Sequence, residues 1–344
     1  MKPDTVWYVI WYLIMSLDMI TKLDKRGQTG EIIVTLFEFC NLSCLFCNQD
    51  HDSLEGVKTI AEKIDVVKQV ILKTPKKEYS IHFMGGEVFA DQLPDHVYTD
   101  YQHVCHELNT WADKEDIKLE ICFTSNMVFD KTDELDEFLK ISNPYLLTSF
   151  DPAGRFNKNT FETFKHNVKK YKQHIKSVNI IMTKPTINRF MNGDVEFFDY
   201  LYENFDVYFD YYTPEKNMEM FIPNDVLLRD FMLYMLEHYP KALPFADYTS
   251  KVKKQMSCMD TVTIMPNNSY GNCTILLKDF KNVTTTKQEM EQEWFKQYSC
   301  LTCKHFQYCS MGCFLSNHMQ SFRTQEACWL SEVYDVVHPD TNTQ

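Results

Sequence analysis

Hydrophobic and polar positions alternate along this chain with two different periods, beginning near residue 31. Short runs of apolar, often β-branched residues predict strands, and apolar residues that recur every three or four positions predict helices. The segment 57–72 has the helical period, and its predicted buried face consists of Val57, Ile60, Ile64, Val67 and Ile71. The two kinds of segment follow one another, which indicates repeated strand–helix units.

The repeated units define the expected fold. The predicted strands are 31–39, 79–84, 117–123, 144–150, 178–183 and 207–212. The predicted helices between them are 57–72, 98–112, 133–141, 159–175 and 194–204. Strands that alternate with helices run parallel and are joined by right-handed crossovers. Because a closed barrel of this kind needs eight units, we predict an α/β fold with a partial (β/α)6 TIM-like barrel.

The alternation stops after Pro214, and the cysteines concentrate toward the C-terminus. The predicted organisation is an N-terminal helical extension over 1–30, the barrel over 31–215, a helical connector over 216–254, a cysteine-rich domain over 255–335 and a flexible tail over 336–344.

The apolar run VWYVIWYLIM near the N-terminus is too short for a membrane span. No small-residue cleavage site follows it, so a signal peptide is not expected. A packed helix is the preferred interpretation, and a helix that meets a partner or a membrane surface is the alternative. We therefore expect a cytoplasmic protein, in which clustered cysteines indicate metal or redox chemistry rather than disulfides.

The balance of charge is acidic, with 35 Lys and Arg against 48 Asp and Glu. This excess argues against binding of duplex nucleic acid, which favours basic surfaces. One basic run comprises Lys169, Lys170, Lys172 and Lys176 and alternates with apolar positions. Its preferred interpretation is the solvated face of an amphipathic helix, with nucleic-acid contact as the alternative.

Three of the 12 cysteines, Cys40, Cys44 and Cys47, follow the first predicted strand at C-x3-C-x2-C spacing. Three soft thiolates can hold three irons of a [4Fe–4S] cube and leave the fourth iron open to a small chelating molecule. A zinc knuckle completed by a distant residue is the alternative.

Polar loops follow the next strands, at 85–87, 124–126 and 149–152. Since βα barrels place their chemistry at the carboxyl ends of the strands, these loops are expected at one rim.

With this cysteine loop after the first strand, the chain resembles the radical S-adenosylmethionine (radical SAM) superfamily. The resemblance implies that the amine and carboxylate of SAM bind the open iron. One-electron cleavage of SAM then gives a 5′-deoxyadenosyl radical that takes a hydrogen atom from a substrate. It also implies SAM-binding roles for a set of residues, namely Phe46, Gly85, Gly86, Glu87, Asn126, Ser149 and Arg155. Ordinary turn and cap chemistry is the alternative for the polar ones.

A second group of cysteines comprises Cys258, Cys273, Cys300, Cys303, Cys309, Cys313 and Cys328. Their order closely resembles the SPASM extension, which carries two auxiliary [4Fe–4S] clusters in peptide-modifying radical SAM enzymes. The resemblance assigns the outer cluster to Cys300, Cys303, Cys309 and Cys328. The inner cluster then has Cys258, Cys273 and Cys313, and either an open iron or a non-cysteine ligand such as Asp247. A zinc ribbon is the alternative.

The chain departs from the family pattern at two positions. Asn268 stands where a glycine is usual, which is tolerable because asparagine accepts the left-handed conformation. Thr274 stands where sulfatase-maturating members carry an acidic base, so that activity is not expected. The remaining cysteines, Cys105 and Cys122, are predicted to be buried and inert.

Three functions are consistent with these features. The first is a radical SAM enzyme that modifies a peptide or protein side chain and draws electrons from a donor such as flavodoxin or ferredoxin. The second keeps the chemistry but acts on a small metabolite, sugar or nucleotide. The third is a non-enzymatic iron–sulfur electron carrier or sensor, which does not account for the polar loops that accompany the cysteines.

Overall fold

The computed structural model of the chain describes residues 29–47, 49–212, 218–249, 261–271, 287–306 and 328–339, together with Cys273, Cys309 and Cys313. The predicted N-terminal helix over 1–28, Cys258 and most of the predicted tail lie outside the described residues.

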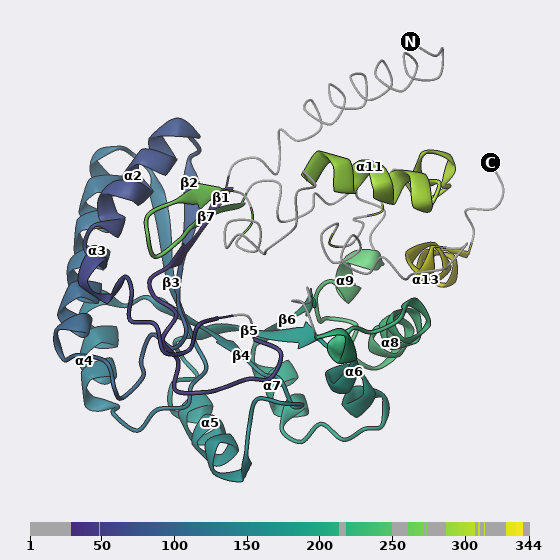
Figure 1. Cartoon of the computed structure of the whole chain (residues 1–344), viewed down its shortest axis with the longest axis horizontal. Helices are drawn as coiled ribbons and strands as arrows, with labels where there is room; N and C mark the ends of the chain where they lie inside the picture. Colours follow the sequence, from purple (N-terminus) through teal and green to yellow (C-terminus); the bar gives the residue numbers. More distant parts are fainter. Residues whose placement is uncertain are drawn as a thin grey trace.

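A curved sheet of parallel strands forms the centre of the fold (Figure 1). Its first six strands are β1 (Thr29–Thr35), β2 (Glu78–Met84), β3 (Lys118–Ser125), β4 (Tyr145–Ser149), β5 (Ile175–Met182) and β6 (Asp206–Tyr211). They pair in chain order, each parallel to the next. The predicted partial barrel of six βα units is thereby confirmed.

Helices cover the convex side of the sheet, as Figure 1 shows for α2 to α5. The connecting helices are α2 (Lys63–Lys73), α3 (His96–Lys114), α4 (Asp133–Ser142), α5 (Lys158–Lys170), α6 (Lys184–Met191) and α7 (Phe198–Asn204). The hydrophobic pattern does not predict helix α6. The Thr183 hydroxyl accepts from the Thr186 N–H at its start, and Pro185 occupies the first turn, where a missing N–H costs nothing.

The strands bury alternate residues. In β2, Tyr79, Ile81 and Phe83 are buried against the helices, whereas Ser80 and His82 lie partly accessible on the concave side. A closed (β/α)8 barrel fills its interior with branched apolar side chains. This partial barrel has a polar and accessible concave wall instead.

Two further strands extend the sheet beyond β1, which the sequence pattern does not predict. Strand β7 (Thr261–Ile264) runs parallel to β1, and β8 (Tyr270–Gly271) runs antiparallel to β7. The N-terminal part of the cysteine-rich segment is therefore built onto the barrel sheet. A strand of this length lacks a recognisable hydrophobic period, so its pairing with β1 is visible only in the folded chain.

The turn between β7 and β8 is held by a buried lysine from α2. The Lys63 ammonium donates to the Met265 and Pro266 carbonyls at 2.9 and 2.8 Å and to Asn268 Oδ1 at 2.6 Å. Asn268 has a φ of 66°, as expected for an asparagine in place of glycine. All three donor positions of the ammonium are used, which makes Lys63 a structural residue.

The C-terminal part packs beside the end of β6. It contains α8 (Asp225–His238), α9 (Phe245–Tyr248), α11 (Lys287–Gln297) and α13 (Trp329–Val337). Short 3-10 turns of the chain lie at Val57–Thr59, between β1 and α2, and at Glu219–Phe221 and Cys300–Thr302. Helix α13 lies against α8 (Figure 1). The hydroxyls of Tyr211 on β6 and Tyr248 on α9 are 2.9 Å apart and join the two parts.

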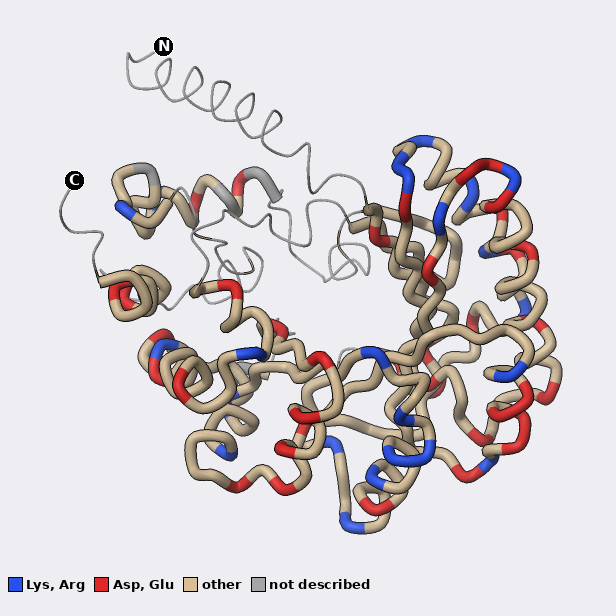
Figure 2. The backbone as a smooth tube through the Cα atoms, turned by 180° about the vertical axis from the view of Figure 1, so that it is seen from behind, with Lys and Arg blue, Asp and Glu red and all other residues tan. Residues whose placement is uncertain are grey.

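Charged residues of both signs are mixed over the described surface (Figure 2). The predicted basic run is only in part a helical face, because α5 ends at Lys170 and Lys176 lies in β5. Lys170 contacts Asp136, Lys172 contacts Asn204 and Lys176 contacts Glu120. In the part of the chain that the structure describes, no helix is both long and apolar enough to cross a bilayer.

Candidate metal centre

The cysteine loop continues the hydrogen bonding of β1 and β2 beyond the ends of these strands. The Leu36 N–H donates to the Met84 carbonyl at 2.7 Å, and the Gly86 N–H donates to the Phe37 carbonyl at 3.0 Å. The Glu87 N–H then donates to the Phe39 carbonyl at 2.8 Å, directly before Cys40. The backbone of residues 85–87 therefore determines where the cysteine loop begins.

The two glycines of this segment allow the loops to approach each other. A Cβ atom on Gly86 would lie 2.0 Å from the Phe39 carbonyl oxygen, and one on Gly85 would lie 2.7 Å from the Phe37 carbonyl oxygen. Both neighbours are backbone atoms, which cannot move aside as a flexible side chain can. The family resemblance implies that these glycines serve the close approach of a ligand, whereas the structure shows close approach of the cysteine loop itself.

We expect Gly86→Ala to lose the iron of the first cluster, about a third of the total iron, because the new methyl group displaces the start of the cysteine loop. Gly193→Ala is the control, since a Cβ atom added there would have nothing within 4 Å, although the φ of Gly193 is 68°. This control should cost about 1 kcal/mol of stability and keep its iron. Iron and sulfide analysis after anaerobic reconstitution measures both, and a Gly86→Ala protein with full iron content would contradict the role given to Gly86.

Glu87 joins the loop after β2 to the loop after β3. Its carboxylate is 0% exposed and accepts from the Phe89 N–H at 3.0 Å, the Ser125 hydroxyl at 2.8 Å and the Asn126 N–H at 2.5 Å. Burial raises the pKa of Glu87 to about 7, against the effect of these donors. With both oxygens used by protein donors, the carboxylate is a brace between loops. The SAM-binding role that the resemblance implies for Glu87 stays a prediction.

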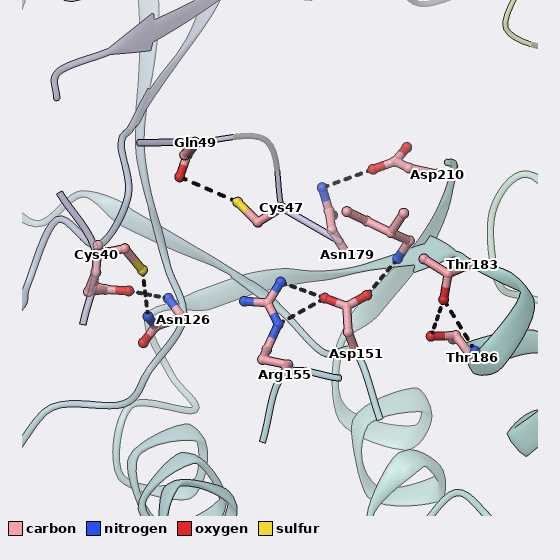
Figure 3. Close-up of polar contacts among 12 residues, drawn as sticks. Cys40, Cys47, Gln49, Asn126, Asp151, Arg155, Asn179, Thr183, Thr186 and Asp210 are labelled. Carbon is pink, nitrogen blue, oxygen red and sulfur yellow. Dashed lines mark hydrogen bonds and ion pairs between the residues drawn. The ribbon is translucent and has the colours of Figure 1, made fainter. Parts of the chain in front are cut away.

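Asn126, at the end of β3, holds the first cysteine in place. Its side-chain amide donates to Asn41 Oδ1 at 2.9 Å and lies 3.7 Å from Cys40 Sγ (Figure 3). Asn41 in turn donates to the Val128 carbonyl. On the other side of the loop, Gln49 donates to the Gly85 carbonyl at 2.8 Å and lies 3.9 Å from Cys47 Sγ.

A buried ion pair stands beside the cysteine loop (Figure 3). The Arg155 guanidinium donates from Nε and Nη2 to Asp151 Oδ2 at 2.9 and 2.5 Å, and the Ile181 N–H donates to Asp151 Oδ1 at 2.9 Å. The side chains are 10% and 0% exposed. Burial opposes the charge of Arg155, but Asp151 outweighs it and holds the pKa of the guanidinium above its ordinary value. Arg155 also lies 5.8 Å from the centre of the Phe46 ring.

Cys40 and Cys44 are poor free nucleophiles. Burial raises the pKa of Cys40 to about 12, although the Leu42 N–H, 3.4 Å from Cys40 Sγ, opposes this effect. Burial likewise raises the pKa of Cys44, against the positive charge of Arg155. Reactive cysteines have lowered pKa values. These thiols instead become thiolates when a bound metal replaces their protons.

The donor set fits an iron–sulfur cluster. An iron–sulfur cube distributes its thiolate ligands over separate irons. One buried and two partly buried soft thiols, with N–H groups and a guanidinium nearby, suit such a cluster. Among the residues that the structure describes, no three side chains of Cys, His, Asp or Glu converge closely enough to hold one metal ion.

The other predicted SAM-binding residues lie at the same rim. Phe46 is buried against Phe221, with ring centres 6.4 Å apart, and Ser149 is the last residue of β4, opposite Asn179 of β5. Asn41, Gln49 and Asp151 are not among the residues that the sequence predicts. Asn41 and Gln49 flank the cysteines in the sequence, and Asp151 belongs to the predicted loop at 149–152. This closeness to predicted site residues is the signal by which the sequence could have indicated them.

The distal cysteines that the structure describes form a second group of thiols. Burial raises the pKa of Cys300 to about 12, and Cys328, Cys309 and Cys303 are near enough to raise it further. Cys313 and Cys309 lie near Tyr211. Because Cys258 is outside the described residues, the predicted inner set is untested. Cys105 and Cys122 are buried, as predicted.

A partial barrel with a three-thiol loop after its first strand defines a class of proteins that bind a metal cofactor at the strand ends. The sequence profile of the radical SAM superfamily matches residues 34–195. A curated relative, the radical SAM cyclopropyl synthase TigE of Paramaledivibacter caminithermalis, is 23% identical over 202 residues. The match covers 52% of this chain and 40% of that protein, so this chain aligns with less than half of its relative.

Two solved structures have the same fold. Native anSMEcpe with bound AdoMet has a TM-score of 0.63 and 14% identity, covering 89% of this chain and 95% of that one. SuiB of Streptococcus suis has a TM-score of 0.52 and 17% identity, covering 92% and 82% of the two chains. Over residues 34–195, the chain is therefore similar to the radical SAM superfamily. The cofactors of this family are a [4Fe–4S] cluster and SAM.

Proposed function

We propose that this protein reductively cleaves SAM and uses the resulting radical to modify a peptide or protein side chain. The observation that carries the proposal is that one rim of the barrel holds the cysteine loop, the backbone of residues 85–87 and the Arg155–Asp151 pair. When bound, the cluster supplies the electron that cleaves SAM to the 5′-deoxyadenosyl radical, which then takes hydrogen from the substrate.

The residues of the rim have separate tasks in this proposal. Cys40, Cys44 and Cys47 hold the cluster, and Arg155 places a positive charge beside Cys44 that compensates the thiolates. The Gly85–Glu87 segment positions the cysteine loop. Phe46, Asn126 and Ser149 are assigned to SAM.

The peptide substrate is inferred from the distal cysteines. Cys303, Cys309 and Cys328 all lie within electrostatic range of Cys300, which supports an outer auxiliary cluster of the kind found in SPASM extensions. Such extensions occur in peptide-modifying radical SAM enzymes. The inner auxiliary cluster is assigned to Cys258, Cys273 and Cys313, with Asp247 or substrate at its remaining iron.

Anaerobic reconstitution tests the proposal. We expect about twelve irons per chain, four per cube, and 5′-deoxyadenosine when SAM and a strong reductant are added. A pooled synthetic peptide library, incubated under the same conditions, should yield peptides that have lost hydrogen, as detected by mass spectrometry. Verified clusters without 5′-deoxyadenosine would falsify the enzymatic function. Zinc in place of iron in the distal region would exclude the auxiliary clusters.

A further inference from the structure

A polar chain of side chains crosses the concave wall of the barrel below the rim. It runs from β7 to β5 through Thr261, Glu31, His82, Ser80, Glu120 and Lys176. These residues come from five strands that lie far apart in the sequence, and none of them belongs to the cysteine loop. At its centre is an imidazole whose two nitrogens have different surroundings.

Nε2 of His82 is held by Ser80, its neighbour on the concave face of β2. Nε2 lies 2.8 Å from Ser80 Oγ, and the Ser80 hydroxyl donates to Glu120 Oε1 at 3.3 Å. Because Ser80 has a single proton and gives it to Glu120, its oxygen accepts from the Nε2–H of His82. Neutral His82 therefore carries its lone pair on Nδ1.

The other nitrogen is open. Nδ1 is 3.7 Å from Glu31 Oε1, which is beyond hydrogen-bond distance but close enough for Glu31 to stabilise a positive charge. Glu31 is held by the Thr261 hydroxyl, 2.5 Å from Oε2. The His82 side chain is 24% exposed, on the concave side of the sheet. A basic nitrogen with an orienting partner on one side and a carboxylate on the other is the arrangement of a general base.

The charged groups that face His82 come from three strands. Glu31 on β1 and Glu120 on β3 favour the imidazolium, and Lys176 on β5 disfavours it. Burial is the largest influence and lowers the pKa of His82 below its ordinary value of 6.5. Tyr208 and Asp210 of β6 lie across the chamber, within electrostatic range of Glu31. At neutral pH His82 is thus neutral and ready to accept a proton.

We propose that His82 is the proton acceptor of the substrate reaction, with Glu31, Ser80 and Glu120 as positioning residues. This rests on the proposed function, and it places the reacting group of the substrate on the concave side of the sheet. An N–H, O–H or S–H group of the substrate gives its proton to Nδ1, which forms the imidazolium and leaves the bonding electron pair on the substrate heteroatom. No redox change occurs at His82.

The proton affinity of His82 is measured on the reconstituted full chain with diethyl pyrocarbonate, which acylates neutral imidazole. Peptide mapping should show His82 reacting with a midpoint below pH 6.5. Glu31→Gln should lower that midpoint by about one pH unit, since a stabilising carboxylate is lost. His103, exposed on α3, is the internal control and should react alike in both proteins. A His82 that stays unmodified at every pH, or a midpoint unchanged by Glu31→Gln, overturns the proposal even if SAM is cleaved.

The catalytic role is measured as product formed per 5′-deoxyadenosine with the library peptides that react. We expect His82→Gln to lower this ratio at least about 100-fold and to remove its rise with pH. His103→Gln should keep the wild-type ratio and pH profile. A His82→Gln protein with the wild-type ratio refutes the role of His82. Absence of 5′-deoxyadenosine from the wild-type protein instead refutes the proposed function, and the acylation profile still decides the state of His82.

Discussion

Replacing Cys40, Cys44 and Cys47 together by alanine removes about a third of the iron and abolishes the formation of 5′-deoxyadenosine. The physical reason is that burial raises the pKa of Cys40 and Cys44, so the pocket accepts negative thiolates only when a metal compensates them. Without the thiols nothing in the loop binds iron. Iron and sulfide analysis and chromatography of the SAM products measure the two effects.

A matched control is Cys105→Ala. Cys105 is equally buried, in α3, but lies away from the loop, so its loss should leave both the iron content and SAM cleavage intact. The two auxiliary clusters should also persist in the triple variant, since their predicted ligands lie at residues 258–328. If the triple variant retains the full iron content or still cleaves SAM, the loop is not the catalytic metal site.

Arg155→Met is expected to destabilise the protein by about 3–5 kcal/mol, because it leaves the fully buried Asp151 carboxylate without its partner. The variant should also bind the first cluster poorly, since the cation beside Cys44 is lost. Denaturant unfolding of the full chain gives the free energy, and iron analysis gives the occupancy.

Two further variants separate the causes. Asp151→Asn combined with Arg155→Met removes both charges and should recover part of the stability but not the cluster binding. Arg229→Met breaks a pair between half-exposed partners, Asp230 and Glu332, and should cost about 1 kcal/mol or less. If Arg155→Met and Arg229→Met lower the free energy of unfolding equally, the Asp151 carboxylate is not left buried and unpaired by the Arg155 substitution.

The strands and the cysteine loop could be predicted from the sequence because both signals are local. Each strand is a short apolar run between helical periods, and the spacing of Cys40, Cys44 and Cys47 is contained within eight residues. The parallel order of the strands then brings the loops after them to one rim, which is why the predicted and observed sites coincide there.

The contacts between loops could not be predicted in this way. Glu87 connects two loops through its hydrogen bonds with Ser125 and Asn126, which lie almost forty residues further along the chain. The requirement for glycine at Gly86 arises from the Phe39 carbonyl of a different loop. Strand β7 is recognisable only by its pairing with β1. Each of these features depends on how distant segments meet, which the hydrophobic pattern does not specify.

The hydrogen bonds from Gly86 and Glu87 to the cysteine loop also concern how the protein acquires iron. In a zinc finger, metal binding and folding are a single event. Here the sheet already holds the loop through the Phe37 and Phe39 carbonyls, independently of any metal. We therefore expect that the cluster is inserted after the chain has folded, and that a cluster destroyed by oxygen is rebuilt in the same molecule without its unfolding.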